Sequence, residues 1–203
     1  PAVTEVTRFL ETQGFEITLV PVDKFGMVDP DRVAKALRPE TILISVMHAN
    51  NEVGTIQPVA AIADIARRHG ALMHTDAAQS IGKIPVDVKE LDVDLLSIAG
   101  HKLYAPKGIG VLFIHHGVKI EKLMHGADHE QNLRAGTENV LEIVGLGKAC
   151  EIAGRDLENN LIHLAQMRSR LQKGLIERLG NLRINVHPSR HLPNTLSIGF
   201  NVA

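Results

Sequence analysis

Cysteine is nearly absent from this chain, since Cys150 is the only one among 203 residues. One thiol excludes an internal disulfide framework and any all-thiolate metal site within a single chain. An excess of one charge is missing too, because 22 Lys and Arg residues stand against 23 Asp and Glu residues. The balance gives no global attraction to nucleic acid or to an anionic membrane.

Long apolar runs are also lacking: none approaches the ~20 residues that span a bilayer, and no secretory signal pattern opens the chain. We therefore expect a soluble, cytoplasmic protein, or an organellar one if a targeting segment has been removed. A hydrophobic fraction of 44% is sufficient for a globular core. The sequence begins without Met inside an amphipathic pattern and stops inside a predicted strand, so we expect a fragment.

Segments typical of strands alternate with segments typical of helices. Asp29 and Pro30 provide an N-cap and a first-turn proline for a helix to about residue 37, and Gly70 ends a helix over 58–69. The sequence predicts strands over 16–22, 41–47, 71–75, 95–99 and 110–114. This alternation predicts an α/β fold: a mostly parallel sheet with helices on both faces. The run 41–47 is the type expected of a strand buried on both sides.

A long helical stretch follows Asn139. Ile143, Gly147, Cys150 and Gly154 recur at three- and four-residue spacing, which predicts a buried face with Cys150 as a structural residue. Two further strands, 182–186 and 195–200, indicate the start of a smaller α+β region. We expect two domains: 1–139 as a large domain and 140–203 as a linking helix with part of a small domain.

Polar residues follow three of the predicted strands, where parallel strands present their carboxyl ends at one rim. They are Asn50 to Glu52, Asp76 to Gln79 and Gly100 to Lys102. Pyridoxal phosphate requires a lysine for its covalent attachment and a carboxylate that keeps the pyridine nitrogen protonated. Lys102 and Asp76 are candidates for these two roles, although an Asp and a Lys at such a distance are uninformative alone.

Four motifs in the same order and spacing are similar to those of the cysteine desulfurases and selenocysteine lyases, which are related to class V aminotransferases. They are 47–54 (MHANNEVG), 74–80 (HTDAAQS), 100–104 (GHKLY) and 134–139 (RAGTEN). The resemblance covers nearly the whole chain. It implies a fold-type I pyridoxal-phosphate transferase domain and a homodimer, with a role in iron–sulfur cluster assembly and a sulfur-acceptor protein as partner.

The resemblance also implies the role of each site residue. Lys102 holds the cofactor and is the catalytic residue, while Asp76 binds the pyridinium nitrogen. Asn51 and Gln79 donate to the ring oxygen, as suits neutral amides. The phosphate is contacted by His101 and, in the cofactor site of the neighbouring subunit, by Thr137. The implied reaction converts L-cysteine to L-alanine and leaves the sulfur on an enzyme cysteine as a persulfide.

Some residues depart from the family pattern. Ala99 replaces a hydroxyl residue that contacts the phosphate in many members, and Ala105 stands where glycine is frequent. The mobile loop with the nucleophilic cysteine is expected after Ala203, so we expect this chain to be inactive alone. Selenocysteine as substrate, another class V aminotransferase, and a non-catalytic or dimerising module remain alternatives. We expect no metal site, although His125 and His129 lie four residues apart.

Overall fold

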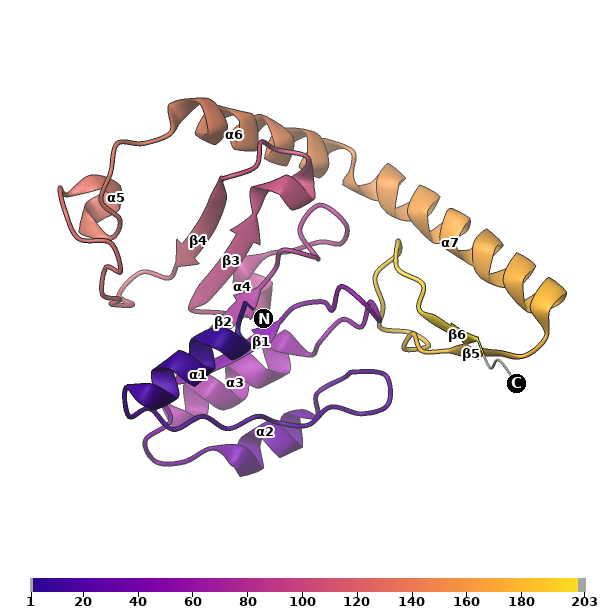
Figure 1. Ribbon diagram of the computed structural model, residues 1–203, viewed down its shortest axis with the longest axis horizontal. Coiled ribbons are helices and arrows are strands. Elements are labelled where there is room, and N and C mark those ends of the chain that lie inside the picture. Colours follow the sequence, from indigo (N-terminus) through magenta and orange to yellow (C-terminus); the bar gives the residue numbers. More distant parts are fainter. Residues whose placement is uncertain (1, 201–203) are drawn as a thin grey trace.

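The computed structural model describes residues 2–200 and contains one four-stranded sheet, one two-stranded sheet and the helices around them (Figure 1). None of the helices within these residues is long and apolar enough to cross a membrane. The elements in chain order are α1 (Thr4–Thr12), α2 (Pro30–Ala36), β1 (Leu43–Met47), α3 (Val59–His69), β2 (Leu72–Asp76), α4 (Val88–Leu91), β3 (Leu95–Ala99), the 3₁₀ helix η1 (Gly100–Leu103), β4 (Gly110–Ile114), α5 (His129–Asn132), α6 (Val140–Arg155), α7 (Leu157–Leu179), β5 (Leu182–Ile184) and β6 (Ile198–Phe200).

The main sheet has the order β1-β2-β3-β4, with β1, β2 and β3 parallel and β4 antiparallel to β3. Met47, Asp76 and Ser97 stand side by side at one edge of this register. The α/β prediction with a mostly parallel sheet is confirmed. The strands β5 and β6 form a separate antiparallel pair beside the end of α7 (Figure 1).

Helix α3 covers one face of the sheet. Its side chains Ile62 and Ala66 join Met73 and Leu96 of the strands in one buried cluster. Burying each large apolar side chain contributes about 1.5–3 kcal/mol, so this cluster is the main source of stability. The helix ends at Gly70, whose left-handed backbone (φ 88°) closes it as the sequence predicts.

The opposite face of the sheet is polar along one row. His74 of β2 lies between Ser45 of β1 and Ser97 of β3, with Nδ1 2.8 Å from Ser45 Oγ and Nε2 2.9 Å from Ser97 Oγ. Leu43 on the same face is 46% exposed. The prediction that 41–47 is buried on both sides is therefore wrong.

The segment 16–22 is not a strand, contrary to the prediction from its β-branched residues. It runs extended and forms a single bridge between Val22 and Val28 across the turn at Gly26. Val20 packs against the core while Leu19 is 75% exposed. A strand needs a partner for its backbone groups, and no strand within the described residues pairs with this segment.

Helix α6 buries a different face from the one its sequence pattern predicts. Leu146, Ala149 and Ala153 pack with Leu103 of η1, whereas Gly147, Cys150 and Gly154 are exposed. Each buried position precedes a predicted one by a single residue, which amounts to about 100° around the helix. The glycines and the cysteine offer little apolar area, so Leu146 and the two alanines determine the buried side. Cys150 is thus a surface thiol and not a core residue.

The chain near β5 and β6 is attached to the loop that follows β1. Leu192 N donates to the Gly54 carbonyl at 2.8 Å, and Ile56 N donates to the Arg190 carbonyl at 3.0 Å. Gly54 has φ 74°, and a Cβ there would lie 2.8 Å from the Cβ of Thr195. Only glycine meets both conditions, so this residue permits the close approach of the two segments.

We predict that Gly54→Ala destabilises the protein more than Gly70→Ala. Both residues have positive φ, but no atom lies within 4 Å of a Cβ at Gly70. Gly70→Ala, the matched control, should lower the free energy of unfolding by about 1–2 kcal/mol because of the left-handed backbone. Gly54→Ala has the same cost and loses about 1–3 kcal/mol more because of steric overlap. Urea unfolding of both variants measures the difference. Equal midpoints would show that the loop and Thr195 are not packed together.

A second prediction concerns His48, whose buried Nδ1 lies 2.9 Å from Ser80 Oγ. Burial lowers the pKa of His48, so in the folded protein this side chain takes up its proton at a lower pH than in the unfolded chain. In the unfolded chain a histidine is protonated below about pH 6.5. The unfolded state then binds more protons, and the free energy of unfolding falls as pH drops through that value, by at most about 1.4 kcal/mol per pH unit for each proton.

We expect His48→Gln to reduce this pH dependence, measured by urea unfolding between pH 7.5 and pH 5. The matched control is His116→Gln, because His116 is exposed. An unchanged slope in His48→Gln would contradict the assignment to His48.

Candidate active site

Three loops leave the sheet at the carboxyl ends of β1, β2 and β3. The backbone pairing continues one residue beyond the strands: His48 N donates to the Asp76 carbonyl at 2.8 Å and Ala77 N to the Ser97 carbonyl at 2.9 Å. These bonds hold the starts of the loops at a single rim. The rim is the place predicted for the polar side chains.

Asp76 is the last residue of β2 and is half-buried. Its Oδ1 accepts a hydrogen bond from Ala78 N at 2.8 Å, which directs the chain into a tight turn. Among residues 2–200, no hydrogen bond reaches its second oxygen, Oδ2. The carboxylate also acts on His74 of the polar row: burial lowers the pKa of His74, and the negative charge of Asp76 opposes this effect. Asp76 therefore has an oxygen available at the rim.

Lys102 lies in η1, directly after β3. Gly100 begins this helix with its N–H donating to the Ile109 carbonyl at 3.0 Å, and a Cβ at Gly100 would lie 2.8 Å from that oxygen. Leu103 is buried, and Tyr104 ends the turn in a left-handed conformation (φ 64°). The backbone around Lys102 is thus fixed on both sides while its own side chain is exposed. Within residues 2–200 its amine forms no ion pair.

The turn after β2 packs against η1. Gly82 has φ 71°, and a Cβ there would lie 2.4 Å from the side chain of Leu103. Lys83, next to it, has its pKa lowered by burial and, to a smaller extent, by the charge of Lys102. The turn that begins at Asp76 thus brings Gln79 and Lys83 to the same part of the rim as Lys102.

Lys83 is a residue that the sequence analysis missed. Its Nζ donates to the backbone carbonyl of Gln79 at 2.9 Å and to Gln79 Oε1 at 3.0 Å. The spacing of four residues from Gln79 is the only signal in the sequence, and it indicates a contact only once the backbone between them is known to form a compact turn.

The loop after β1 presents Asn51 at its tip. The neighbouring Asn50 folds back on the loop, where its Oδ1 accepts from Glu52 N at 2.8 Å and from Val53 N at 2.9 Å. Asn50 is thereby committed to the loop, and Asn51 is exposed. His101 and Thr137 are exposed as well, His101 beside Lys102 and Thr137 between α5 and α6. The roles of these three residues remain predictions.

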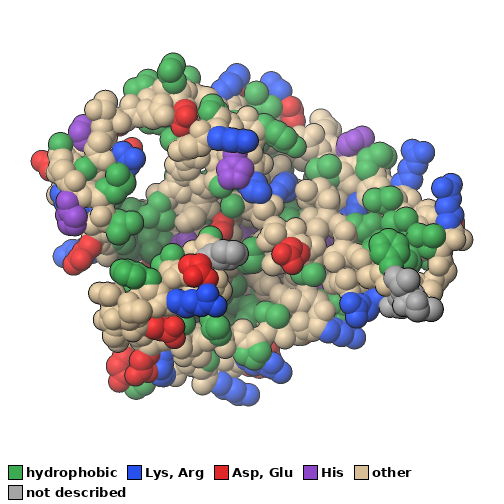
Figure 2. Space-filling view, viewed as in Figure 1, with side chains coloured by type: hydrophobic (Ala, Val, Ile, Leu, Met, Phe, Trp, Pro, Cys, Tyr) green, Lys and Arg blue, Asp and Glu red, His purple; other side chains and the backbone are tan. Residues whose placement is uncertain are grey.

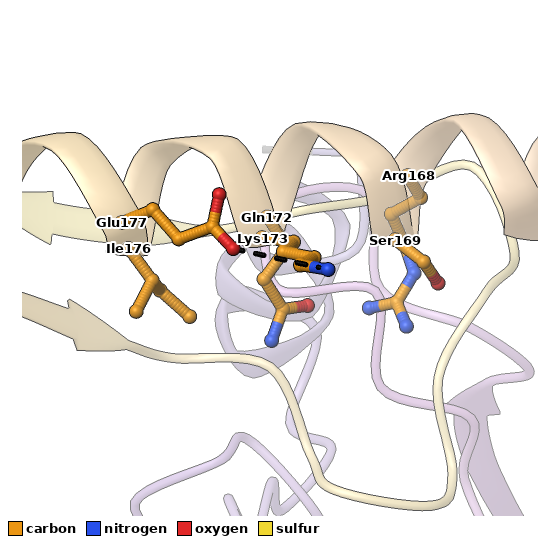
Figure 3. A pocket seen from close by; sticks show the side chains of 6 residues that line it. All are labelled: Arg168, Ser169, Gln172, Lys173, Ile176 and Glu177. Atoms are coloured by element: carbon orange, nitrogen blue, oxygen red, sulfur yellow. Dashed lines mark ion pairs between the residues drawn. The ribbon is translucent and has the colours of Figure 1, made fainter.

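Other surface features do not contain the predicted residues. A hollow of about 420 Å³ lies along α7 (Figure 3), and one of about 560 Å³ lies between the segment 21–32 and Arg190. All six residues of the first come from a single helix, so it is an open depression. Charged side chains of both signs are scattered over the face in Figure 2. Within residues 2–200, no cluster of three His, Cys, Asp or Glu side chains is placed to hold a metal ion.

The chain is similar to proteins named as cysteine desulfurases. "Cysteine desulfurase IscS" of Methanosarcina thermophila is 50% identical, and that of Dictyoglomus turgidum is 49% identical, each over 98% of this chain. The chain spans 49% and 50% of these two relatives, which is about half their length.

Solved structures have the same fold. A "NifS-like protein" superposes with a TM-score of 0.93 and 43% identity over 98% of this chain and 55% of its own. A cysteine desulfurase from Thermococcus onnurineus gives a TM-score of 0.82 at 26% identity, over 99% of this chain and 54% of its own. The family model described as "Aminotransferase class-V" matches residues 2–203. The chain therefore belongs to the aminotransferase class-V family.

Proposed function

We propose that this chain is the cofactor-binding part of a pyridoxal-phosphate-dependent cysteine desulfurase. The observation that carries the proposal is that Asp76, Gln79 and Lys102 lie at one rim of the sheet. The relatives of the chain are named cysteine desulfurases. In the proposed reaction the C–S bond of L-cysteine breaks. The carbon skeleton becomes L-alanine, and the sulfur joins an enzyme cysteine thiolate as a persulfide.

The residues present fit pyridoxal phosphate by their chemistry. Lys102 provides an exposed primary amine, and Asp76 provides a carboxylate with one oxygen free of hydrogen bonds among residues 2–200. Gln79 has its side-chain oxygen occupied by Lys83, so its amide nitrogen is left to donate. An amine, a carboxylate and a neutral donor are the groups that the aldehyde, the pyridine nitrogen and the ring oxygen require.

Each residue then has one task. Lys102 attaches the cofactor and moves a proton at the substrate α-carbon. Asp76 keeps the ring nitrogen protonated, and Gln79 and Asn51 donate to the ring oxygen. His101, and Thr137 from the neighbouring subunit, bind the phosphate. When bound, pyridoxal phosphate withdraws electrons from the α-carbon of the substrate.

We also propose a homodimer and retain the division into 1–139 and 140–203. Apolar side chains at the start of α6 support the dimer, because Leu141 is 86% exposed and Val144 is exposed beside it. A sulfur-acceptor protein, a role in iron–sulfur cluster assembly and a cytoplasmic location complete the proposal. Selenocysteine remains the alternative substrate.

The decisive prediction is that the chain with added pyridoxal phosphate gains a near-visible absorbance band that survives dialysis. Borohydride reduction followed by peptide mass spectrometry should find the cofactor on Lys102, because its amine is exposed at the rim. Lys102→Ala should lose both signals, and Lys89→Ala, on the short helix α4, should keep them. Attachment to another lysine would overturn the assignment.

A further prediction is that Cys150 does not accept the sulfur. Its side chain is exposed beside, and not within, the face of α6 that packs on η1. The neighbouring Lys148 is engaged by Glu151 at 2.7 Å, so its charge is not directed at the thiol. After incubation of the cofactor-loaded chain with L-cysteine, mass spectrometry should show no persulfide on Cys150. A persulfide that disappears in Cys150→Ser would make this residue the nucleophile.

A further inference from the structure

Lys83 holds both oxygens of a single residue. Its half-buried side chain turns back, and Nζ lies 2.9 Å from the main-chain oxygen and 3.0 Å from the side-chain oxygen of Gln79. The backbone between the two residues forms one compact turn, because Ile81 N donates to the Ala77 carbonyl and Lys83 N to the Ser80 carbonyl, each at 3.0 Å. The ammonium group is therefore positioned by the turn and not by chance contact at the surface.

This contact determines which end of the Gln79 amide faces the rim. A glutamine side chain has one end that accepts and one that donates, and the two ends exchange by a simple flip. An ammonium group only donates, so it selects the orientation in which Oε1 faces Lys83. The amide nitrogen then points elsewhere, and Gln79 presents donors alone to any group at the rim.

Within residues 2–200, no ion pair competes with Gln79 for the ammonium group of Lys83. In this described part of the chain, no carboxylate forms an ion pair with Lys83 or with Lys102. The packing of Gly82 against Leu103 places Lys83 beside η1, where Lys102 is its charged neighbour. A positive charge behind a neutral amide polarises the amide and strengthens its N–H donors.

We propose that Lys83 is a positioning residue that orients Gln79 as an obligate hydrogen-bond donor to the ring oxygen of the cofactor. The proposal rests on the proposed function and extends it by one residue. The ammonium group acts through Gln79 and does not touch the cofactor.

The experiment measures the dissociation constant of pyridoxal phosphate and of its 3-deoxy analogue, which lacks the ring oxygen, by absorbance titration. Lys83→Met removes the donor while keeping the length of the side chain. It should weaken the binding of pyridoxal phosphate about tenfold, which is the effect of one lost charge-assisted hydrogen bond. The binding of the analogue should not change. Lys83→Arg should restore most of the affinity, because a guanidinium also only donates.

A double-mutant cycle tests whether the effect passes through Gln79. In a Gln79→Ala background, Lys83→Met should cause no further loss of affinity. Lys89→Met on α4 is the matched control and should bind both compounds like the unmodified chain. The proposal would be overturned if Lys83→Met weakened the binding of both compounds equally. It would also be overturned if the losses of affinity in Lys83→Met and Gln79→Ala were fully additive.

The experiments distinguish a wrong function for the chain from a wrong role for Lys83. If the unmodified chain forms no borohydride-reducible attachment at Lys102, the proposed function fails. If it forms that attachment and Lys83→Met binds both compounds as tightly as the unmodified chain, the role of Lys83 alone is refuted. Should Lys83→Met not fold, by circular dichroism, the comparison of Lys83→Arg with Lys83→Gln replaces it, since glutamine permits either amide orientation.

Discussion

The parallel register of β1, β2 and β3 is the constraint on which the rest of the structure depends. Parallel strands require crossovers, so every strand of the set ends at the same edge and each following loop begins there. The bonds from His48 N to Asp76 O and from Ala77 N to Ser97 O carry the register into the loops. Asp76 and Lys102 share a rim for this reason, although 25 positions separate them in the chain.

Packing between the loops then fixes how they lie at the shared rim. Gly82 fits under Leu103 only because it has no side chain, and this contact brings the turn after β2 against η1. His48 bonds to Ser80 from the loop after β1, so all three loops are joined at their bases. These contacts restrict the backbone conformation of the loops that contain Asp76, Gln79, Lys83 and Lys102.

The helix that follows illustrates how a face is selected. α6 contains two overlapping patterns, one with Leu146, Ala149 and Ala153 and one shifted by a single residue through Gly147, Cys150 and Gly154. The first pattern buries more apolar area against Leu103. The second contains small residues, so leaving them exposed to water forfeits little of the free energy gained by burying apolar surface. Periodicity alone identified the helix but not the side that packs.

The sequence by itself determined the strands after residue 41 to within three residues at each end, the capping residues Asp29 and Gly70, and the parallel α/β class, because these follow from local chemistry and short-range periodicity. Its motifs also predicted the candidate residues, whose roles stay predictions. The tertiary structure decided that 16–22 forms a single bridge instead of a strand, that Cys150 is exposed, and that Lys83 bonds to Gln79. Each of these depends on which distant surface is available for contact, and a pattern of neighbours along the chain contains no information about that surface.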